Sequence, residues 1–311
     1  RVEGLEDYRP IGAFSFLGRY RVIDFPISNL SNSDIDRIQI YVQEKPRTLV
    51  AHVGTGRHYN INSKSGKLQI LFSDAGQRDN IYNTDIAAYY ENLECIEAMH
   101  HPYVVITPDY MVYSADFSKL IQQHIDSEAD ITLLYHSVDN AKDSFLNCNI
   151  LNLNKQKGVL SIEPNHGNAK NRNIFMDTYI MKKDLFVDLI HKARAISSAF
   201  TLTDVINEMH NDLDVRGVSH RGFFASITDF QSYYDANMDL IDIKAAQTLF
   251  DPEWPIYTRT NDSCPTHYYD TAEIRNSVVS NGCQIEGTIE NSIIGRGCVI
   301  HKDAVIKNSI I

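Results

Sequence analysis

The feature that most constrains the fold is a repeat near the end of the 311-residue chain. The triplets Ser277-Val278-Val279, Ser292-Ile293-Ile294 and Ser309-Ile310-Ile311 recur at spacings of 15 and 17 residues, and Gly282-Cys283-Gln284-Ile285 is echoed by Gly297-Cys298-Val299-Ile300. Short apolar runs separated by Gly, Asn and polar residues are typical of a parallel β-helix, whose coils bury apolar side chains against each other. We therefore predict a linker and β-helix over residues 251–311. Because the sequence stops inside a repeat, we expect that the native chain continues or that a partner covers the last coil.

Residues 1–250 have the pattern of an α/β domain. Apolar runs and helical spacing predict, in order, a strand at 38–42, a helix at 85–99, a strand at 103–106, a helix at 117–125 and a strand at 131–135. Such alternation is typical of a Rossmann-like, mixed but mostly parallel sheet with helices on both faces. Ligands of such sheets bind at the carboxyl ends of the strands.

Charge and composition exclude several classes of function. The formal net charge is −11, whereas nucleic acids and anionic membranes require a cationic surface. No apolar run approaches the roughly 20 residues that span a bilayer. The five cysteines are an odd number without CxxC spacing, which fits reduced thiols. We expect a cytoplasmic protein with neither nucleic-acid nor membrane partners.

Two segments carry a family resemblance. Residues 20–35, YRVIDFPISNLSNSDI, resemble the YRLIDFPLSNCxNSGI stretch of glucose-1-phosphate adenylyltransferases (ADP-glucose pyrophosphorylases), and residues 233–240, YYDANMDL, are similar to the family's YWxANLDL helix. The resemblance implies a sugar-nucleotidyltransferase-like α/β domain, a left-handed parallel β-helix of hexapeptide-type repeats and a tetramer. It also implies a reaction of ATP with glucose 1-phosphate that needs cations against the phosphates and carboxylates for Mg²⁺.

The positions that match the family's catalytic residues have changed. The RxKP motif aligns with Arg9-Pro10-Ile11-Gly12, which keeps Arg9 but places Ile11 at the phosphate-binding lysine. The second metal aspartate, in GYWRDVGT, aligns with Ser226. The first, in GDHIY, aligns with Tyr110, and Asp109 lies one residue early. We therefore expect no intact catalytic or metal site.

The positions that match the substrate pocket have changed as well. The GTADAV segment aligns with 84–89, which places Thr84 and Asp85 at the base-binding turn without its glycine. The FVEKP motif keeps Glu163 but lacks the lysine, and the glycine of SMG is replaced by Asp177. The family's glycine-rich nucleotide loop would lie just before Arg9, where the only glycine is Gly4, so this loop is lost or precedes the sequence.

These replacements resemble the non-catalytic, regulatory D-type subunit found in some bacteria. The resemblance implies a subunit for glycogen biosynthesis that has no cofactor of its own and modulates a catalytic homologue, which holds the Mg²⁺, in a heterotetramer. One alternative is an active adenylyltransferase or other sugar-nucleotidyltransferase with an atypical site. Another is an acyltransferase-like trimer built on the β-helix, although His301 is the only histidine in the repeats.

Basic residues offer a possible site for an anionic effector. Family activators are sugar phosphates, and Arg19 matches the lysine of the family's GK(Y/F)R motif, with Arg47, His52 and Arg57 as possible neighbours. Arginine suits phosphate through its planar set of donors. The alternative is ordinary solvated surface charge. For the carboxylates Asp24 and Asp34 in the hallmark stretch we predict a structural role as caps of turns or helices, and for His100 and His101 we predict no zinc role because no ligand follows at metal spacing.

Overall fold

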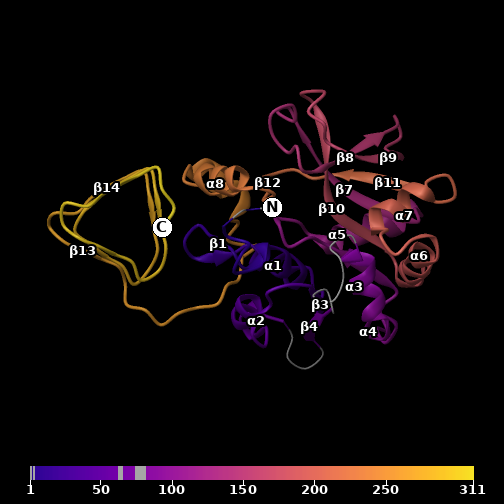
Figure 1. The fold of residues 1–311 in the computed structure, drawn as a ribbon, viewed down its shortest axis with the longest axis horizontal. Helices are drawn as coiled ribbons and strands as arrows, with labels where there is room; N and C mark the ends of the chain where they lie inside the picture. Colours follow the sequence, from indigo (N-terminus) through magenta and orange to yellow (C-terminus); the bar gives the residue numbers. More distant parts are fainter. Residues whose placement is uncertain (1, 3, 62–65, 74–81) are drawn as a thin grey trace.

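The computed structural model describes residues 2, 4–61, 66–73 and 82–311. An α/β domain is followed by a β-helix of triangular cross-section, and helices α8 (Phe230–Asp239) and α9 (Ile243–Leu249) lie on the side of the domain that faces the β-helix (Figure 1). No helix in the described part of the chain is long and apolar enough to cross a bilayer.

The α/β domain contains short and medium helices and two longer strands. Its other helices are α1 (Asp24–Asn32), α2 (Arg47–Val53), α3 (Asp85–Glu91), α4 (Leu93–Glu97), α5 (Phe117–Ser127), α6 (Lys183–Ile196) and α7 (Leu202–Glu208), with the 3-10 turns η1 (Ile11–Ala13) and η2 (Arg57–Tyr59). Its strands are β1 (Ser15–Phe16), β2 (Tyr20–Arg21), β3 (Arg37–Val42), β4 (Lys67–Phe72), β5 (Tyr103–Ile106), β6 (Met111–Tyr113), β7 (Ile131–Val138), β8 (Asn149–Leu153), β9 (Val159–Pro164), β10 (Arg172–Lys182), β11 (Val215–Ser219) and β12 (Phe224–Ser226).

The main sheet is mixed, as predicted, but its pairings are mainly antiparallel rather than parallel. Its strand order is β11-β7-β10-β8-β9, with β5 also paired to β10. Only β11 and β7 are parallel in this sheet; β3 and β4 form a separate parallel pair. For one of these pairings the physical reason is connection length: β8 reaches β9 through residues 154–158, and so short a loop can join only antiparallel neighbours.

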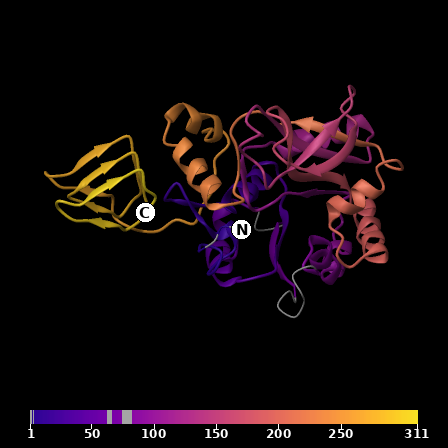
Figure 2. The same cartoon turned by 45° about the horizontal axis from the view of Figure 1, so that its top comes forward.

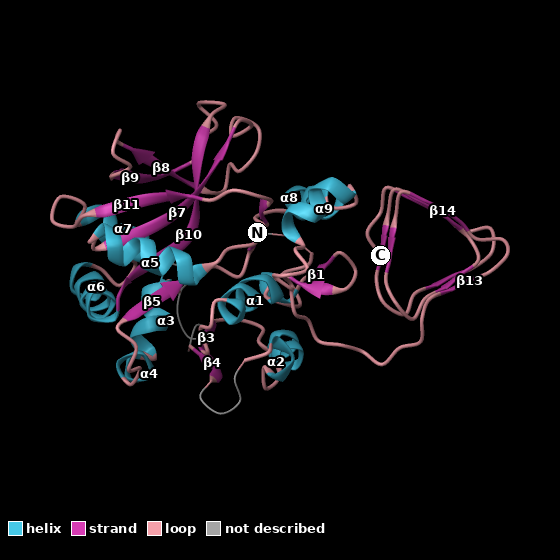
Figure 3. Ribbon diagram, turned by 180° about the vertical axis from the view of Figure 1, so that it is seen from behind, coloured by secondary structure: helices cyan, strands magenta, loops and turns pink. Residues whose placement is uncertain are grey.

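Helices cover both faces of this sheet, as predicted (Figure 3). Adjacent residues of β7 point to opposite faces, so Leu133 packs in the core formed with α6 and α7, and Leu134 packs in the core that includes Phe117 of α5. The predicted strands at 38–42, 103–106 and 131–135 and the helix at 117–125 are confirmed.

The predicted helix at 85–99 is instead two helices, α3 and α4. Asn92 interrupts the helical backbone with φ −113° and ψ 23°. Its side-chain amide donates to the carbonyl of Ala88 at 3.0 Å, which is the competition with backbone hydrogen bonding that disfavours Asn inside helices.

The β-helix stacks its coils in the register that the repeats predict. Its strands are β13 (His267–Tyr268), β14 (Glu273–Arg275), β15 (Val278–Val279), β16 (Gln284–Ile285), β17 (Thr288–Glu290), β18 (Ile293–Ile294), β19 (Val299–Ile300) and β20 (Val305–Lys307). All pairings between coils are parallel, and the stacked strands are visible in Figure 2. Three corner asparagines with positive φ, Asn276, Asn291 and Asn308, also bond to one another in a ladder. These parallel ladders fit a left-handed β-helix.

The two domains meet at the turn between β1 and β2. A Cβ atom at Gly18, whose φ is +65°, would lie 2.8 Å from both the carbonyl oxygen of Ile294 and the hydroxyl of Ser280. A second contact is the hydroxyl of Tyr234 on α8, which donates to the carbonyl of Asn308 at 2.9 Å. The junction therefore depends on a glycine that allows close backbone approach.

We predict that Gly18→Ala weakens this junction. Gly297→Ala is a matched control, because Gly297 also has a positive φ, +73°, but a methyl group added there would meet no atom within 4 Å. The control should lower the free energy of unfolding by about 1–2 kcal/mol through backbone strain alone. Gly18→Ala should cost at least about 1 kcal/mol more because of the clash, as measured by chemical denaturation. Equal losses in both variants would contradict the close packing.

Candidate functional site

At the first predicted metal position, a tyrosine is hydrogen-bonded to a carboxylate from another strand. Tyr110 directly precedes β6, and its hydroxyl donates to Oδ2 of Asp177 on β10. Asp177 has a φ of +42° and lies within the irregularity that separates Phe175 from Tyr179 in the pairing of β10 with β7. This backbone conformation favours glycine, the residue that the family's SMG motif has there, and here it directs a carboxylate toward Tyr110.

A second carboxylate adds negative charge to this region. Asp85, the first residue of α3, accepts hydrogen bonds from the backbone N–H groups of Ile86 at 2.8 Å and Leu202 at 3.1 Å. Burial raises the pKa of Asp85 to about 6. Burial, with a smaller contribution from Asp85, raises the pKa of Asp177 to about 7. Neither carboxyl group offers positive charge to a phosphate, and in its ionised form each would repel one.

The position that matches the family's second metal aspartate holds a serine. Ser226 at the end of β12 is buried, and its hydroxyl accepts from the thiol of Cys148 at 3.3 Å. The carboxylate of Asp109 lies against Gly12, where an added Cβ would be 2.7 Å from Oδ2, and burial raises its pKa. Ile11 packs against an apolar cluster to which the N-terminal segment, β12 and α8 contribute. Magnesium is held mainly by oxygen ligands from carboxylates, phosphates and water, so the phenol of Tyr110 and the hydroxyl of Ser226 do not fit the family's Mg²⁺ site.

The predicted substrate residues make local structural contacts. Thr84 caps α3 by accepting from the N–H of Ala87 at 3.2 Å. Glu163 is exposed on β9, and its carboxylate accepts from the hydroxyl of Ser161 at 2.6 Å. Arg9 is half-buried and close enough to Arg21 to contribute to lowering the pKa of that guanidinium, for which burial is the main cause.

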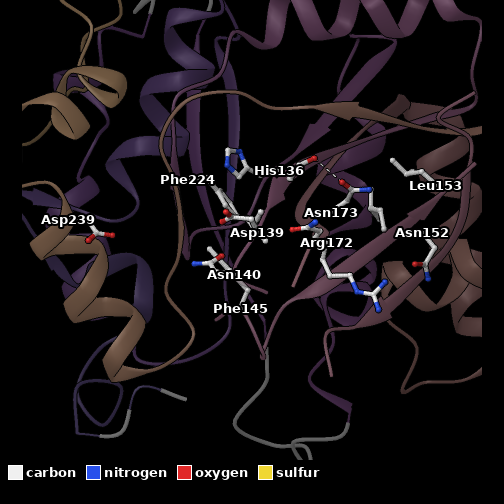
Figure 4. Close-up of a pocket in the computed structure, with 14 residues that line it drawn as sticks. His136, Asp139, Asn140, Phe145, Asn152, Leu153, Arg172, Asn173, Phe224 and Asp239 are labelled. Carbon is white, nitrogen blue, oxygen red and sulfur yellow. Dashed lines mark hydrogen bonds between the residues drawn. The ribbon is translucent and has the colours of Figure 1, made fainter. Parts of the chain in front are cut away.

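An open pocket of about 870 Å³ is lined by residues of β7, β8, β10 and β12 and by the end of α8 (Figure 4). Phe224 of β12 forms part of its wall and stacks on Phe145, with ring centroids 5.7 Å apart. Four asparagines and the side chains of His136, Asp139, Arg172 and Asp239 also face it; the asparagines are Asn140, Asn152, Asn171 and Asn173. None of the predicted site residues lines this pocket, so the sequence prediction missed it.

The four residues predicted for an anionic effector do not share one environment. Arg19, Arg47 and Arg57 are exposed, and the guanidinium of Arg19 lies 5.6 Å from the ring centroid of Tyr20. His52 instead faces a carboxylate, with Nε2 2.6 Å from Oδ1 of Asp24.

Arg296 of the β-helix is a neighbour of Arg19 that the sequence prediction missed. Burial, with a further contribution from Arg19, lowers the pKa of Arg296. Its Nη1 donates to the carbonyl of Arg259 at 2.9 Å, and its Nε is buried without a hydrogen-bond partner in the described part of the chain. No spacing in the sequence links residues 19 and 296, because only the docking of the two domains brings them together.

Comparisons with known proteins agree with this architecture. Residues 7–243 match the Nucleotidyl transferase family, and residues 265–311 match the GlmU-like, C-terminal hexapeptide family. A glucose-1-phosphate adenylyltransferase of Clostridium botulinum (strain Alaska E43 / Type E3) is 30% identical over 307 residues, which cover 96% of this chain and 78% of the relative. The chain belongs to the glucose-1-phosphate adenylyltransferase family.

Other family members with the same name show similar likeness. The protein of Clostridium perfringens (strain 13 / Type A) is 29% identical over 306 residues, covering 96% of this chain and 77% of the relative. The protein of Clostridioides difficile (strain 630) is 27% identical over 304 residues, which cover 96% of this chain and 78% of the relative. Similarity over nearly the whole chain places both domains in the family.

We predict that Asp177→Asn reduces the pH dependence of stability. The ordinary pKa of this carboxyl, 3.8, is raised to about 7 in the folded protein. As pH rises through this window the unfolded chain loses the proton while the folded protein keeps it, so the free energy of unfolding falls. Asn keeps an acceptor for Tyr110 and tolerates the positive φ, but has no proton to lose.

Chemical denaturation at several pH values between about 4 and 8 tests this prediction. Relative to wild type, Asp177→Asn should become more stable as pH rises, whereas the exposed control Asp143→Asn should follow wild type. Parallel pH profiles for wild type and Asp177→Asn would contradict the raised pKa.

Proposed function

We propose that the chain is a catalytically deficient, regulatory subunit of a glucose-1-phosphate adenylyltransferase, the enzyme that joins ATP and glucose 1-phosphate into ADP-glucose and pyrophosphate. The observation that carries the proposal is the hydrogen bond of Tyr110 to Asp177 at the position where a metal-binding carboxylate is required. The buried hydroxyl of Ser226 at the other metal position supports it. In this proposal the Mg²⁺ belongs to a catalytic homologue.

The size of the expected loss of catalytic rate favours a regulatory role over slow catalysis. Removal of one group that stabilises a transition state typically costs about 2.7–4 kcal/mol. Loss of two such groups, the lysine at Ile11 and the carboxylate at Ser226, corresponds to a rate lower by about 10⁴-fold or more. In this proposal, a chain that retains the family fold without these groups acts by assembling with a catalytic subunit.

We further propose that a sugar phosphate or similar anion binds at the domain junction near Arg19 and Arg296. Arg19 is exposed, and the buried Nε of Arg296 has no partner in the described part of the chain. Two guanidinium groups that act unfavourably on each other would be stabilised by an anion between them. Such a ligand would bridge the α/β domain and the β-helix of a cytoplasmic heterotetramer.

Mixing the chain with the catalytic homologue of the same genome tests the regulatory role. We predict a complex in size-exclusion chromatography, and a change of about 5-fold or more in the activator concentration that gives half-maximal pyrophosphate release. Arg19→Ala should reduce this change without preventing assembly, whereas the exposed control Arg221→Ala should retain it. Failure to form a complex, together with unaltered kinetics of the homologue, would contradict the proposal.

A further inference from the structure

Three side chains that can bind a metal converge beneath the linker to the β-helix. Asp24 begins α1, His52 lies in the last turn of α2, and His58 lies in η2. One ligand atom from each lies within 4.8 Å of the other two. This is the only group of three or more such residues in the part of the chain that the structure describes.

Two of the three side chains are held in place by their neighbours. Oδ2 of Asp24 accepts from the backbone N–H of Arg21 at 2.8 Å, and Oδ1 accepts from the hydroxyl of the fully buried Tyr59 at 2.6 Å. Nε2 of His52 lies 2.6 Å from the same Oδ1. The hydrogen bonds that Arg21 and Tyr59 donate to Asp24 are of the kind that orient the ligands of metal sites.

The third side chain has an unused ligand atom. Nε2 of His58 is buried but has no hydrogen-bond partner in the described structure. An unpaired buried nitrogen costs free energy, and a metal ion would remove that cost. The ring of His58 also packs at 4.1 Å, centroid to centroid, on Tyr59, so it cannot readily turn away.

We propose that Asp24, His52 and His58 form a binding site for a divalent transition-metal ion, with Zn²⁺ as the best match. Two imidazoles and one carboxylate are a common zinc ligand set that leaves a position for water. A hard ion such as Mg²⁺ prefers an all-oxygen site and fits poorly. None of the three residues stands at a position that matches the family's substrate or metal site, and the proposal does not depend on the proposed regulatory function.

Binding requires only a small rearrangement. Zinc bonds of about 2.0–2.1 Å in a tetrahedral site separate the ligand atoms by about 3.3 Å. The 2.6 Å contact between Nε2 of His52 and Oδ1 of Asp24 must therefore open to this separation, the proton that the two atoms share must leave to the solvent, and His58 must move inward. The bound ion would join α1, α2 and η2, the surface on which Arg259 of the linker donates to the carbonyl of Ala51 at 2.5 Å.

Arg259 also indicates which ligand would compete with a metal ion for this cluster. Its positive charge acts on His58, so an anion such as inorganic phosphate could bind between these two side chains. The negative charge of Asp24, which has no exposed surface, favours the cation at the centre of the cluster. The experiment therefore includes both probes.

The test is isothermal titration calorimetry of the full chain with Zn²⁺ alone, supported by the visible spectrum with Co²⁺. We predict one tight site per chain. Affinity should fall by about 100-fold or more in His58→Gln and in His52→Gln, since even loss of a second-layer hydrogen bond costs about 10–100-fold. Tyr59→Phe keeps all three ligands but removes the hydrogen bond to Asp24, so its Zn²⁺ affinity should fall by about 10–100-fold. Zn²⁺ should raise the melting temperature of wild type.

The exposed histidine variant His166→Ala is the matched control and should bind Zn²⁺ like wild type. No tight Zn²⁺ binding by wild type, or equal binding by wild type and both ligand variants, would overturn the proposal. Stabilisation by inorganic phosphate that is lost in His58→Gln, without Zn²⁺ binding, would assign the cluster to an anion and would overturn it as well. Circular dichroism of each variant confirms that the fold is retained.

Discussion

The close approach of Gly18 to the β-helix is the constraint on which the arrangement of the two domains depends. A Cβ atom added at Gly18 would clash with a backbone oxygen and a side-chain oxygen of the β-helix. The turn between β1 and β2 can therefore dock only with a glycine at this position. Docking brings Arg19 near Arg296, and the linker crosses above the Asp24 cluster. The anion site and the metal site that we propose therefore both lie at or next to this junction.

The positions that match the family's substrate and metal sites lie on the family's scaffold but carry different side chains. Where the family reaction needs cations and metal-binding carboxylates, a phenol, a small hydroxyl and an isoleucine stand at Tyr110, Ser226 and Ile11. The carboxylate of Asp177 is turned inward and shares its region with Asp85, and burial raises the pKa of both groups. Packing of the sheet and helices does not require the family's catalytic groups, so the fold persists although these side chains differ.

Periodic features were predictable from the sequence, whereas features that depend on distant contacts were not. The 15-residue spacing determines that Ile285 stacks on Ile300, since each coil repeats the previous one. The direction of strand pairing in the main sheet depends on connection lengths, which alternation alone does not specify. The replacements at Ile11, Tyr110 and Ser226 could be identified by resemblance to the family. The bond between Tyr110 and Asp177, and the meeting of Asp24 with His58, could not, because only the tertiary fold brings those residues together.

The most direct measurement is pyrophosphate release by the full chain alone, with ATP, glucose 1-phosphate and Mg²⁺. Since neither predicted metal position carries a carboxylate, we predict no Mg²⁺-dependent release above that of a protein-free reaction, even at protein concentrations at which a catalytic relative is readily detected. Mg²⁺-dependent turnover that is abolished by Asp109→Asn would contradict the central claim. It would show that the chain is an active adenylyltransferase that holds its metal with the buried carboxylate beside Gly12.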